Sequence, residues 1–242
     1  MAPSGGFILR NHLFTGIEVG HSGAFSEYLV TYADFVVPLP DAWSFENAAQ
    51  LGIGPLTAFM AFYDLLGLPE FPLREAIANP NATTTPHADG GRPPLPILIS
   101  GGASSVGLYA VQLAKLAGLY VIATASERNF DLVRSFGADV VVDYRDPARA
   151  VKQIREAAPS PIEHALDCVS EGTSLEIVAG SLDGKGTIAN LTLGDYPLVE
   201  GVKVVSGIIF DYFGKVCSEE SASRTAPYFR LETADEPLRA EF

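Results

Sequence analysis

The feature that most constrains the fold is a short apolar run followed by a glycine-rich turn and an amphipathic helix. The apolar run covers residues 96–100, the turn follows at Gly101 and Gly102, and the helical pattern over 105–117 ends at Gly118. Strand–turn–helix units of this kind place a pyrophosphate on backbone N–H groups at a helix N-terminus. The segment therefore makes a dinucleotide-dependent enzyme the leading hypothesis.

The turn carries an incomplete glycine fingerprint. We expect Gly101 and Gly102 to adopt backbone angles closed to L-residues, and Gly107 to let the helix approach the strand closely. Ser104 replaces the second glycine of the usual G-x-G-x-x-G pattern, and its hydroxyl could bond a phosphate oxygen. A glycine-rich turn that binds nothing is the alternative. On the dinucleotide interpretation, Gly102→Asp should abolish cofactor binding and leave the fold largely intact.

The end of the next strand favours NADPH over NADH. Folds that prefer NAD carry an acid about 20 residues beyond the turn, which holds the ribose 2′-OH. Here that position is Ser126, and the donors Arg128 and Asn129 follow it. An arginine can bind a 2′-phosphate through two hydrogen bonds. Glu127 is expected to point outward, and a plain surface role is the alternative for Arg128.

From residue 96 onward, short apolar strands alternate with helices. The predicted strands cover 96–100, 120–125, 139–143, 163–169, 186–191 and 202–208, and the predicted helices cover 105–117, 128–136, 147–157 and 173–182. Continuous apolar strands joined by helices indicate a parallel sheet covered on both faces. With right-handed crossovers, the predicted fold class is α/β with a doubly wound parallel (Rossmann) sheet.

The chain before residue 96 is organised differently. Residues 23–30 and 35–40 have the composition of short strands. Ser44 is a natural N-cap for a helix through Leu51, and a second helix is predicted over 57–66 after a break at 52–55. Residues 70–95 lack periodicity and indicate a surface loop inserted between elements.

Charge and composition exclude several classes of protein. The 242 residues carry a net charge of −13 with a pI near 4.6, which argues against a nucleic acid partner. Two cysteines and four histidines stand apart, so we predict no disulfide framework and no metal site. Cys168 has no base near it in sequence, and we interpret it as a packing residue beside the cofactor. Neither a signal peptide nor a membrane span is visible, so we expect a cytoplasmic protein without membrane contact.

Three parts of the chain together resemble the medium-chain dehydrogenase/reductase superfamily. Residues 23–30 are similar to the last part of its GroES-like barrel, residues 48–59 to its linker helices, and residues 100–107, 123–126 and 143–144 to its nucleotide domain. The zinc-independent, quinone oxidoreductase-like branch is the most similar, and within it the trans-acting enoyl reductases that serve fungal polyketide synthases. The resemblance implies a partial GroES-like domain over 1–43, linker helices over 44–69, a loop insertion over 70–95, an NADPH-binding Rossmann domain over 96–215 and a C-terminal tail over 216–242.

The resemblance also implies site residues. It makes the whole turn cofactor-binding (Gly101, Gly102, Ala103, Ser104, Ser105, Val106 and Gly107) and places the pyrophosphate along residues 103–106. It places the 2′-phosphate at Ser126, Glu127, Arg128 and Asn129, the adenosine at Tyr144 and the nicotinamide near Leu191 and Thr192. The substrate would lie against Pro55, Leu56, Thr57, Gly207, Ile208, Ile209 and Phe210. Ordinary packing is the alternative for Leu56, Leu191 and Phe210, and a satisfied tyrosine at the end of a strand is the alternative for Tyr144.

The function that the resemblance implies is that of an NADPH-dependent oxidoreductase of secondary (polyketide) metabolism. Such an enzyme transfers hydride to the activated carbon–carbon double bond of an enoyl thioester or enone, and its partners would be a small-molecule or carrier-bound enoyl substrate and a polyketide synthase. Family members begin and end with a longer barrel, so we expect a chain truncated at both ends. The alternatives are an impaired relative that binds NADPH or docks a synthase without catalysis, and a zinc-dependent alcohol dehydrogenase, against which the scattered Cys and His argue. No catalytic acid is assigned.

Overall fold

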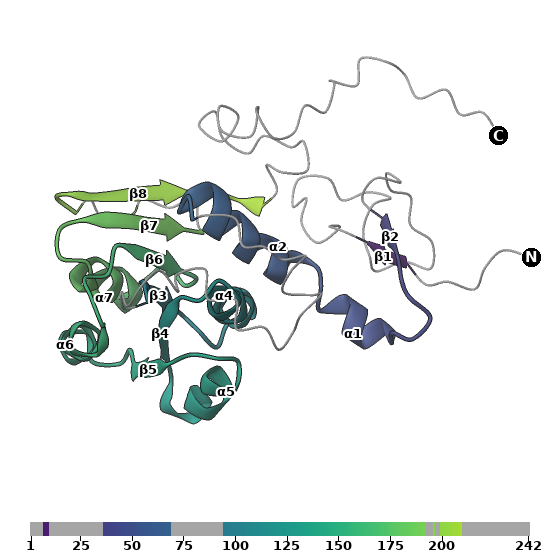
Figure 1. Cartoon of the computed structure of the whole chain (residues 1–242), viewed down its shortest axis with the longest axis horizontal. Helices are drawn as coiled ribbons and strands as arrows, with labels where there is room; N and C mark the ends of the chain where they lie inside the picture. The colour runs from purple at the N-terminus through teal and green to yellow at the C-terminus, as the bar shows by residue number, and fades with distance from the viewer. Residues whose placement is uncertain (1–6, 10–35, 69–93, 192–195, 197–198, 210–242) are drawn as a thin grey trace, which may run out of the picture.

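The main body of the protein is one sheet of six parallel strands. The computed structural model describes residues 7–9, 36–68, 94–191, 196 and 199–209 (Figure 1). The strand order is β5-β4-β3-β6-β7-β8, with bounds β3 (Pro96–Ser100), β4 (Tyr120–Ala125), β5 (Val140–Asp143), β6 (His164–Asp167), β7 (Gly186–Asn190) and β8 (Val202–Ser206). The chain enters in the middle at β3, builds outward to β5 and returns to β6 on the other side of β3. This reversal confirms the predicted doubly wound α/β fold class.

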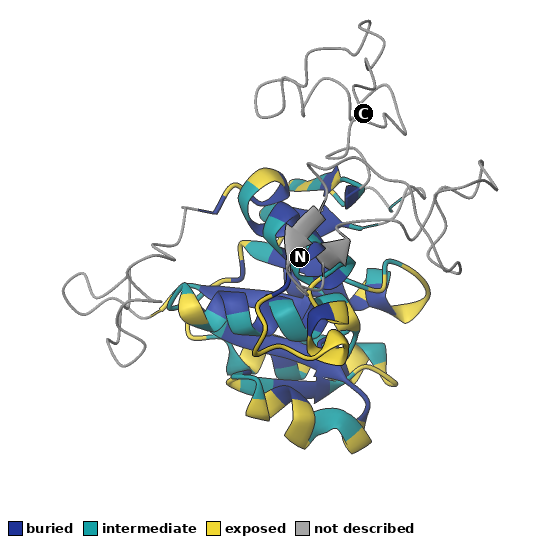
Figure 2. Ribbon diagram, turned by 90° about the vertical axis from the view of Figure 1, so that its right-hand side faces the viewer, coloured by how far each residue is buried: buried dark blue, intermediate teal, exposed yellow. Residues whose placement is uncertain are grey.

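Helices cover both faces of the sheet. α4 (Ser105–Leu116) and α5 (Phe130–Ser135) lie on one face, and α6 (Pro147–Ala157) and α7 (Thr173–Ser181) lie on the other (Figure 1). Successive residues of a strand point to opposite faces, so Ile97 and Ile99 pack on the α4 side whereas Leu98 packs on the α6 side. Figure 2 shows the sheet as the buried layer, with most exposed residues on the outer surfaces of the helices.

Two helices that precede the sheet lead to the α4 face. α1 (Phe45–Ala49) begins after Ser44, whose hydroxyl accepts the N–H of Asn47 at 3.2 Å, and this confirms the predicted N-cap. α2 (Ile53–Met60) continues into a π-helical turn, η2 (Ala61–Leu65). The helix stops at Gly67, as predicted, where φ is +64°. α2 crosses α4 at Gly54, since a Cβ there would lie 2.8 Å from the Ser105 hydroxyl oxygen.

Most of the predicted elements are confirmed, and two predictions are wrong in detail. β3, β4 and α6 have the predicted bounds, and the remaining strands of the sheet are slightly shorter. The predicted break at 52–55 is wrong because α2 already begins there; Pro55 fits its first turn, where no backbone N–H is needed. The predicted helix over 128–136 is divided into a 3₁₀ turn, η3 (Glu127–Asn129), and α5, because the Ser126 carbonyl accepts the N–H of Asn129 at 2.8 Å.

A pair of short strands lies earlier in the chain. β1 (Phe7–Leu9) and β2 (Val36–Pro38) are antiparallel. β2 confirms the predicted strand at 35–40 in a shorter form, and β1 is an addition to the predicted strands. The predicted strand at 23–30, almost all of the predicted loop at 70–95 and the predicted tail at 216–242 lie outside the described residues. Among the helices that the structure describes, none is long and apolar enough to cross a membrane.

The first turn of α4 touches the turn that precedes it. A Cβ on Gly107 would lie 2.2 Å from the Gly101 carbonyl oxygen and 2.9 Å from the Cα of Gly102. Only a glycine fits at this point, as predicted, although the close neighbour is the backbone of the turn itself. The contact brings the N-terminus of α4 directly onto the end of β3.

We expect Gly107→Ala to lower the free energy of unfolding by about 3 kcal/mol, because the turn backbone cannot yield without opening. Chemical denaturation followed by circular dichroism measures this change. Gly180→Ala is the matched control, since Gly180 lies within α7 as Gly107 lies within α4, and the nearest atom to a Cβ there is Cγ2 of the half-buried Val151 at 3.1 Å. The control should change the free energy by less than about 1 kcal/mol. Equal losses in the two variants would contradict the close approach.

Candidate functional site

A row of polar side chains crosses the sheet at the carboxyl ends of its strands. The strand register pairs Ser100 with Asp167, Asp167 with Asn190, and Asn190 with Ser206. The first three are at most 2% exposed. The loops after these strands share one edge of the sheet, and the strand order reverses between β3 and β6. Open α/β sheets bind ligands at such a reversal, so this edge is the candidate site.

The glycine turn is held in place by β4. Gly101 has φ of +73°, as predicted, and its N–H donates to the Thr124 hydroxyl oxygen at 3.1 Å. The N–H of Gly102 donates to the Thr124 carbonyl at 2.8 Å, and the N–H of Ser104 donates back to the Gly101 carbonyl at 2.9 Å. Thr124 is therefore a positioning residue that the sequence did not reveal, since it lies on the next strand.

The turn presents unpaired backbone donors at its tip. The hydroxyl of Ser104 caps α4 by accepting the N–H of Gly107 at 3.0 Å. Within the described part of the chain, the amides of Ala103, Ser105 and Val106 have no hydrogen-bond acceptor. Three free N–H groups at the positive end of a helix form a cradle suited to an anion such as a pyrophosphate.

Gly102 has a different role from the predicted one. It does not have a positive φ, and a Cβ there would lie 2.9 Å from the Cβ of Ala123 and 3.2 Å from Cγ1 of Val133. The residue is a glycine because β4 and α5 leave no space for a side chain. The expectation that Gly102→Asp leaves the fold intact is therefore wrong, because the new carboxylate would be forced between Ala123 and Val133.

The end of β4 presents donors and one unpaired cation. Ser126 is 8% exposed, and its hydroxyl accepts the side-chain N–H of Asn129 at 3.1 Å. Glu127 and Arg128 are exposed on η3. In the described ranges Arg128 makes no ion pair, whereas Arg145 is bound to Asp143. The Arg128 guanidinium is therefore available to a ligand.

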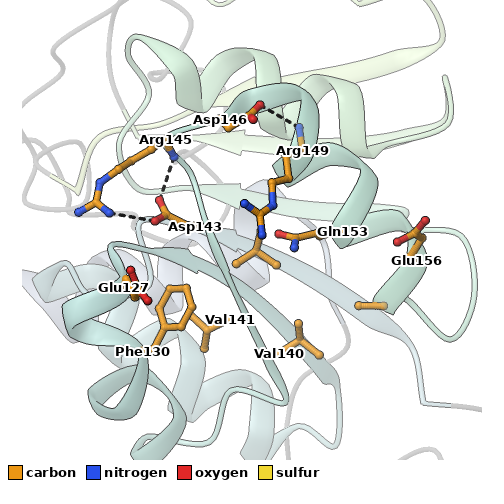
Figure 3. Close-up of a pocket in the computed structure, with 12 residues that line it drawn as sticks. Glu127, Phe130, Val140, Val141, Asp143, Arg145, Asp146, Arg149, Gln153 and Glu156 are labelled. Atoms are coloured by element: carbon orange, nitrogen blue, oxygen red, sulfur yellow. Dashed lines mark hydrogen bonds and ion pairs between the residues drawn. The ribbon is translucent and has the colours of Figure 1, made fainter.

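A hollow of about 640 Å³ lies beside this segment, along the outer edge of β5 (Figure 3). Figure 3 shows Arg149 and Gln153 reaching into it from α6, and Glu127 and Phe130 approaching from the opposite side. No turn residue between 101 and 107 lines it. The hollow therefore belongs to the sheet edge, and not to the reversal point between β3 and β6. Tyr144, the predicted adenosine contact, is 41% exposed just after β5.

The segment after β6 packs on the glycine turn. Cys168 is half-buried, and a Cβ on Gly101 would lie 3.6 Å from its Cβ. Burial raises the pKa of the Cys168 thiol, and the negative charge of Asp167 raises this pKa further. The thiol therefore stays protonated, which agrees with a packing role. Val169 is 40% exposed, and a Cβ on Gly101 would lie only 2.6 Å from its Cγ2.

The predicted substrate residues come from two places in the fold. The first turn of α2 holds Pro55, Leu56 and Thr57 above the start of α4, where Gly54 meets Ser105. Thr57 is buried, and its hydroxyl oxygen has no hydrogen-bond partner among the residues that the structure describes. An unpartnered buried hydroxyl in a native structure calls for an explanation, and a bound ligand that reaches it would supply one.

The second group of predicted substrate residues follows β8. The N–H of Gly207 donates to the Asn190 carbonyl at 3.2 Å, and a Cβ there would lie 2.8 Å from Cδ2 of Leu65. Ile208 is half-buried, and Ile209 is buried in the core. Leu191, predicted near the nicotinamide, is half-buried and packs against the same core. Thr192 and Phe210 lie outside the described residues.

Comparison with known proteins gives one family model and many relatives. The model described as zinc-binding dehydrogenase matches residues 105–211. A trans-enoyl reductase of Gibberella fujikuroi is 41% identical over 170 residues, which is 69% of this chain and 43% of that protein. A trans-enoyl reductase of Alternaria alternata is 40% identical over 174 residues, or 72% of this chain and 46% of that protein. The chain thus spans less than half the length of these two relatives.

Solved structures share the fold. A mycobacterial protein in complex with NADPH matches with a TM-score of 0.57 at 24% identity, over 81% of this chain and 55% of that one. The CurK enoyl reductase matches with the same TM-score at 20% identity and the same coverage. Although the family model is described as zinc-binding, no group of three or more His, Cys, Asp or Glu lies together among the described residues. These residues do not fit a zinc centre.

We expect Thr124→Val to destabilise the protein by about 1–2 kcal/mol, because it leaves the Gly101 N–H without an acceptor. Denaturant unfolding measures the effect. Thr187→Val is the matched control, since Thr187 is a half-buried strand residue whose side chain makes no hydrogen bond within the described part. The control should change the free energy of unfolding by less than about 0.5 kcal/mol. A loss in Thr124→Val no larger than in the control would refute the role given to Thr124.

Proposed function

Since the chain belongs to the medium-chain dehydrogenase/reductase superfamily and is related to the fungal trans-enoyl reductases, we propose that it binds NADPH and reduces an activated carbon–carbon double bond. The observation that carries the proposal is the group of three unpaired amides at Ala103, Ser105 and Val106. They lie at the N-terminus of α4, one strand away from an unpaired guanidinium on Arg128. A backbone cradle for a diphosphate and a neighbouring cation for a further phosphate are the two features that NADPH requires.

The preference for NADPH over NADH follows from the end of β4. Its last side chains are Thr124, Ala125 and Ser126, none of them acidic, so no carboxylate stands where it would accept the ribose 2′-OH. Arg128, Ser126 and Asn129 would instead donate to the 2′-phosphate. Glu127 is the nearest acid, and it is exposed at the start of η3, where a negative charge is favoured by the helix dipole. Tyr144 would contact the adenosine end.

The remaining predicted residues define the reducing half of the site. Bound NADPH supplies the hydride, and the task of the chain is to orient it and to exclude water. Thr57 would donate its unpaired hydroxyl to the nicotinamide side, with Leu191 and Thr192 beside it. Pro55, Leu56 and the segment after β8, with Gly207 and Ile208, would lie against the substrate. None of these side chains is an acid, so the proton that completes the reduction is not assigned to them.

The proposed substrate is an enoyl thioester or enone, either free or attached to a carrier. A polyketide synthase would be the source of the carrier-bound form, as the relation to trans-enoyl reductases suggests. A second candidate function is NADPH binding or docking to a synthase without turnover. It is favoured by the lack of an acidic side chain among the predicted substrate residues Pro55, Leu56, Thr57, Gly207 and Ile208.

We expect Arg128→Ala to weaken NADPH binding about tenfold and to leave NADH binding unchanged, because only NADPH carries the 2′-phosphate. Isothermal titration with the two cofactors measures both dissociation constants. Arg155→Ala is the matched control, since Arg155 is an exposed arginine on α6 that pairs with Asp183 at 2.8 Å. It should bind both cofactors like the wild type. Equal or tighter binding of NADH by the wild type would discard the assignment of the cofactor.

We expect the full chain to consume NADPH when a crotonyl thioester is added, with formation of the butyryl thioester. Loss of NADPH absorbance and mass spectrometry of the product measure the reaction. The butyryl thioester itself, which has no double bond to reduce, is the control and should cause no loss. Saturable NADPH binding without any turnover on enoyl thioesters or enones would support the second candidate function and reject the first.

A further inference from the structure

The carboxylate of Asp167 is bonded to four groups at the carboxyl edge. Asp167 ends β6 and is fully buried. Its Oδ1 accepts the N–H groups of Val169 at 3.0 Å and Ser170 at 2.9 Å. Its Oδ2 accepts the hydroxyl of Tyr196 at 3.2 Å and lies 3.0 Å from the hydroxyl of Ser174. One side chain therefore joins the loop after β6, the first turn of α7 and the segment between β7 and β8.

The negative charge of the Asp167 carboxylate is stabilised by hydrogen-bond donors. None of the ion pairs in the described part of the chain includes Asp167. Its charge raises the pKa of Tyr196, after the larger effect of burial, so the phenol remains a proton donor. A buried carboxylate without a cation is costly unless donors surround it. Two amides and the hydroxyls of Tyr196 and Ser174 meet that requirement.

The bonds to Asp167 fix an unusual backbone conformation. Ser170 has φ of +56°, and among the described residues it is the only one other than glycine with a positive φ. L-residues rarely adopt this conformation, so the surroundings must impose it. Ser170 is bound to Asp167 twice, through its N–H to Oδ1 and through its hydroxyl to the Asp167 carbonyl at 2.8 Å. Without the carboxylate, the N–H groups of Val169 and Ser170 would lose their acceptor, and one of the two bonds that hold Ser170 in this conformation would be lost.

The loop that Asp167 holds lies against the glycine turn. The N–H of Cys168 donates to the Ser100 carbonyl, directly before the turn, at 3.1 Å. Val169 fills the space beside Gly101 so closely that a Cβ on Gly101 would lie 2.6 Å away. Contacts therefore run without a break from Asp167, through residues 168–170, to the turn with the three unpaired amides.

We infer that Asp167 is a positioning residue for the dinucleotide: it holds residues 168–170 in the shape that braces the glycine turn and forms one wall of the site. The inference rests on the proposed function, because it names the ligand whose binding the wall supports. Asp167 does not touch the reacting atoms. Its removal should therefore weaken cofactor binding and leave the rate at saturating cofactor nearly unchanged.

Asp167→Asn tests the inference with little change in shape, because the amide replaces one acceptor oxygen by a donor. We expect an NADPH dissociation constant raised about tenfold, with kcat at saturating NADPH changed less than about threefold. Ile154→Val is the control for a general loss of stability, since Ile154 is fully buried on α6, in the core on the other face of the sheet from α4. Each protein is measured at a temperature equally far below its own melting point. Under these conditions the control should bind NADPH like the wild type. Unchanged affinity in Asp167→Asn, or equal loss in both variants, would overturn the inference.

Labelling of Cys168 gives a second readout that needs no cofactor. In a Cys217→Ser background Cys168 is the remaining thiol of the sequence, and a maleimide should modify it about fivefold faster in Asp167→Asn than in the Ile154→Val control. Equal labelling rates would overturn the inference. Failure of the wild type to bind NADPH would reject the proposed function instead, and the labelling result would still report on the loop.

If Asp167→Asn does not fold, Tyr196→Phe takes its place, because it removes one bond to the carboxylate and keeps the ring. We then expect an NADPH dissociation constant raised about threefold and labelling of Cys168 accelerated in the same direction. Wild-type values of both quantities in Tyr196→Phe would count against the inference.

Discussion

The Gly101 carbonyl oxygen occupies the place that a Cβ of residue 107 would need, and the site depends on this contact. It brings the first turn of α4 onto the end of β3, so that the free amides of the helix start lie at the point where the strand order reverses. The hydroxyl of Ser104 accepts a hydrogen bond from one of these amides, and three others in the described part of the chain have no acceptor. A longer distance between helix and turn would disperse the donors and leave no anion cradle.

The parts of the fold that the sequence predicts are those determined by neighbours in the chain. β3 is buried along its whole length and β4 at every residue after Tyr120, so their apolar runs identify them and their bounds. Ser44 caps a helix with an amide three residues away, and Gly67 and Gly118 end helices with positive φ. In each case the deciding interaction spans a few residues, which is why a pattern in one segment is sufficient.

The parts that the sequence does not predict depend on contacts between distant segments. Thr124 holds an amide 23 residues away, and Tyr196 reaches a carboxylate 29 residues away. Nothing in a single strand indicates such a partner. Gly102 illustrates the same limit. A glycine is required there because Ala123 and Val133 leave no space for a side chain, and not because of its own backbone angles. The site residues are therefore predictable as positions on an edge, whereas the bonds that orient them are not.

The overall charge shows why these short-range contacts matter for function. A chain with a net charge of −13 repels an anionic ligand at long range. The proposed dinucleotide would therefore be held by groups within hydrogen-bond distance, chiefly backbone amides and the exposed Arg128. Amide donors have fixed directions, so their value depends on how rigidly the turn is held. The buried hydrogen bonds of Thr124 and Asp167 hold the turn rigid from two sides. The geometry of the sheet edge, and not its net charge, therefore determines which ligands the site distinguishes.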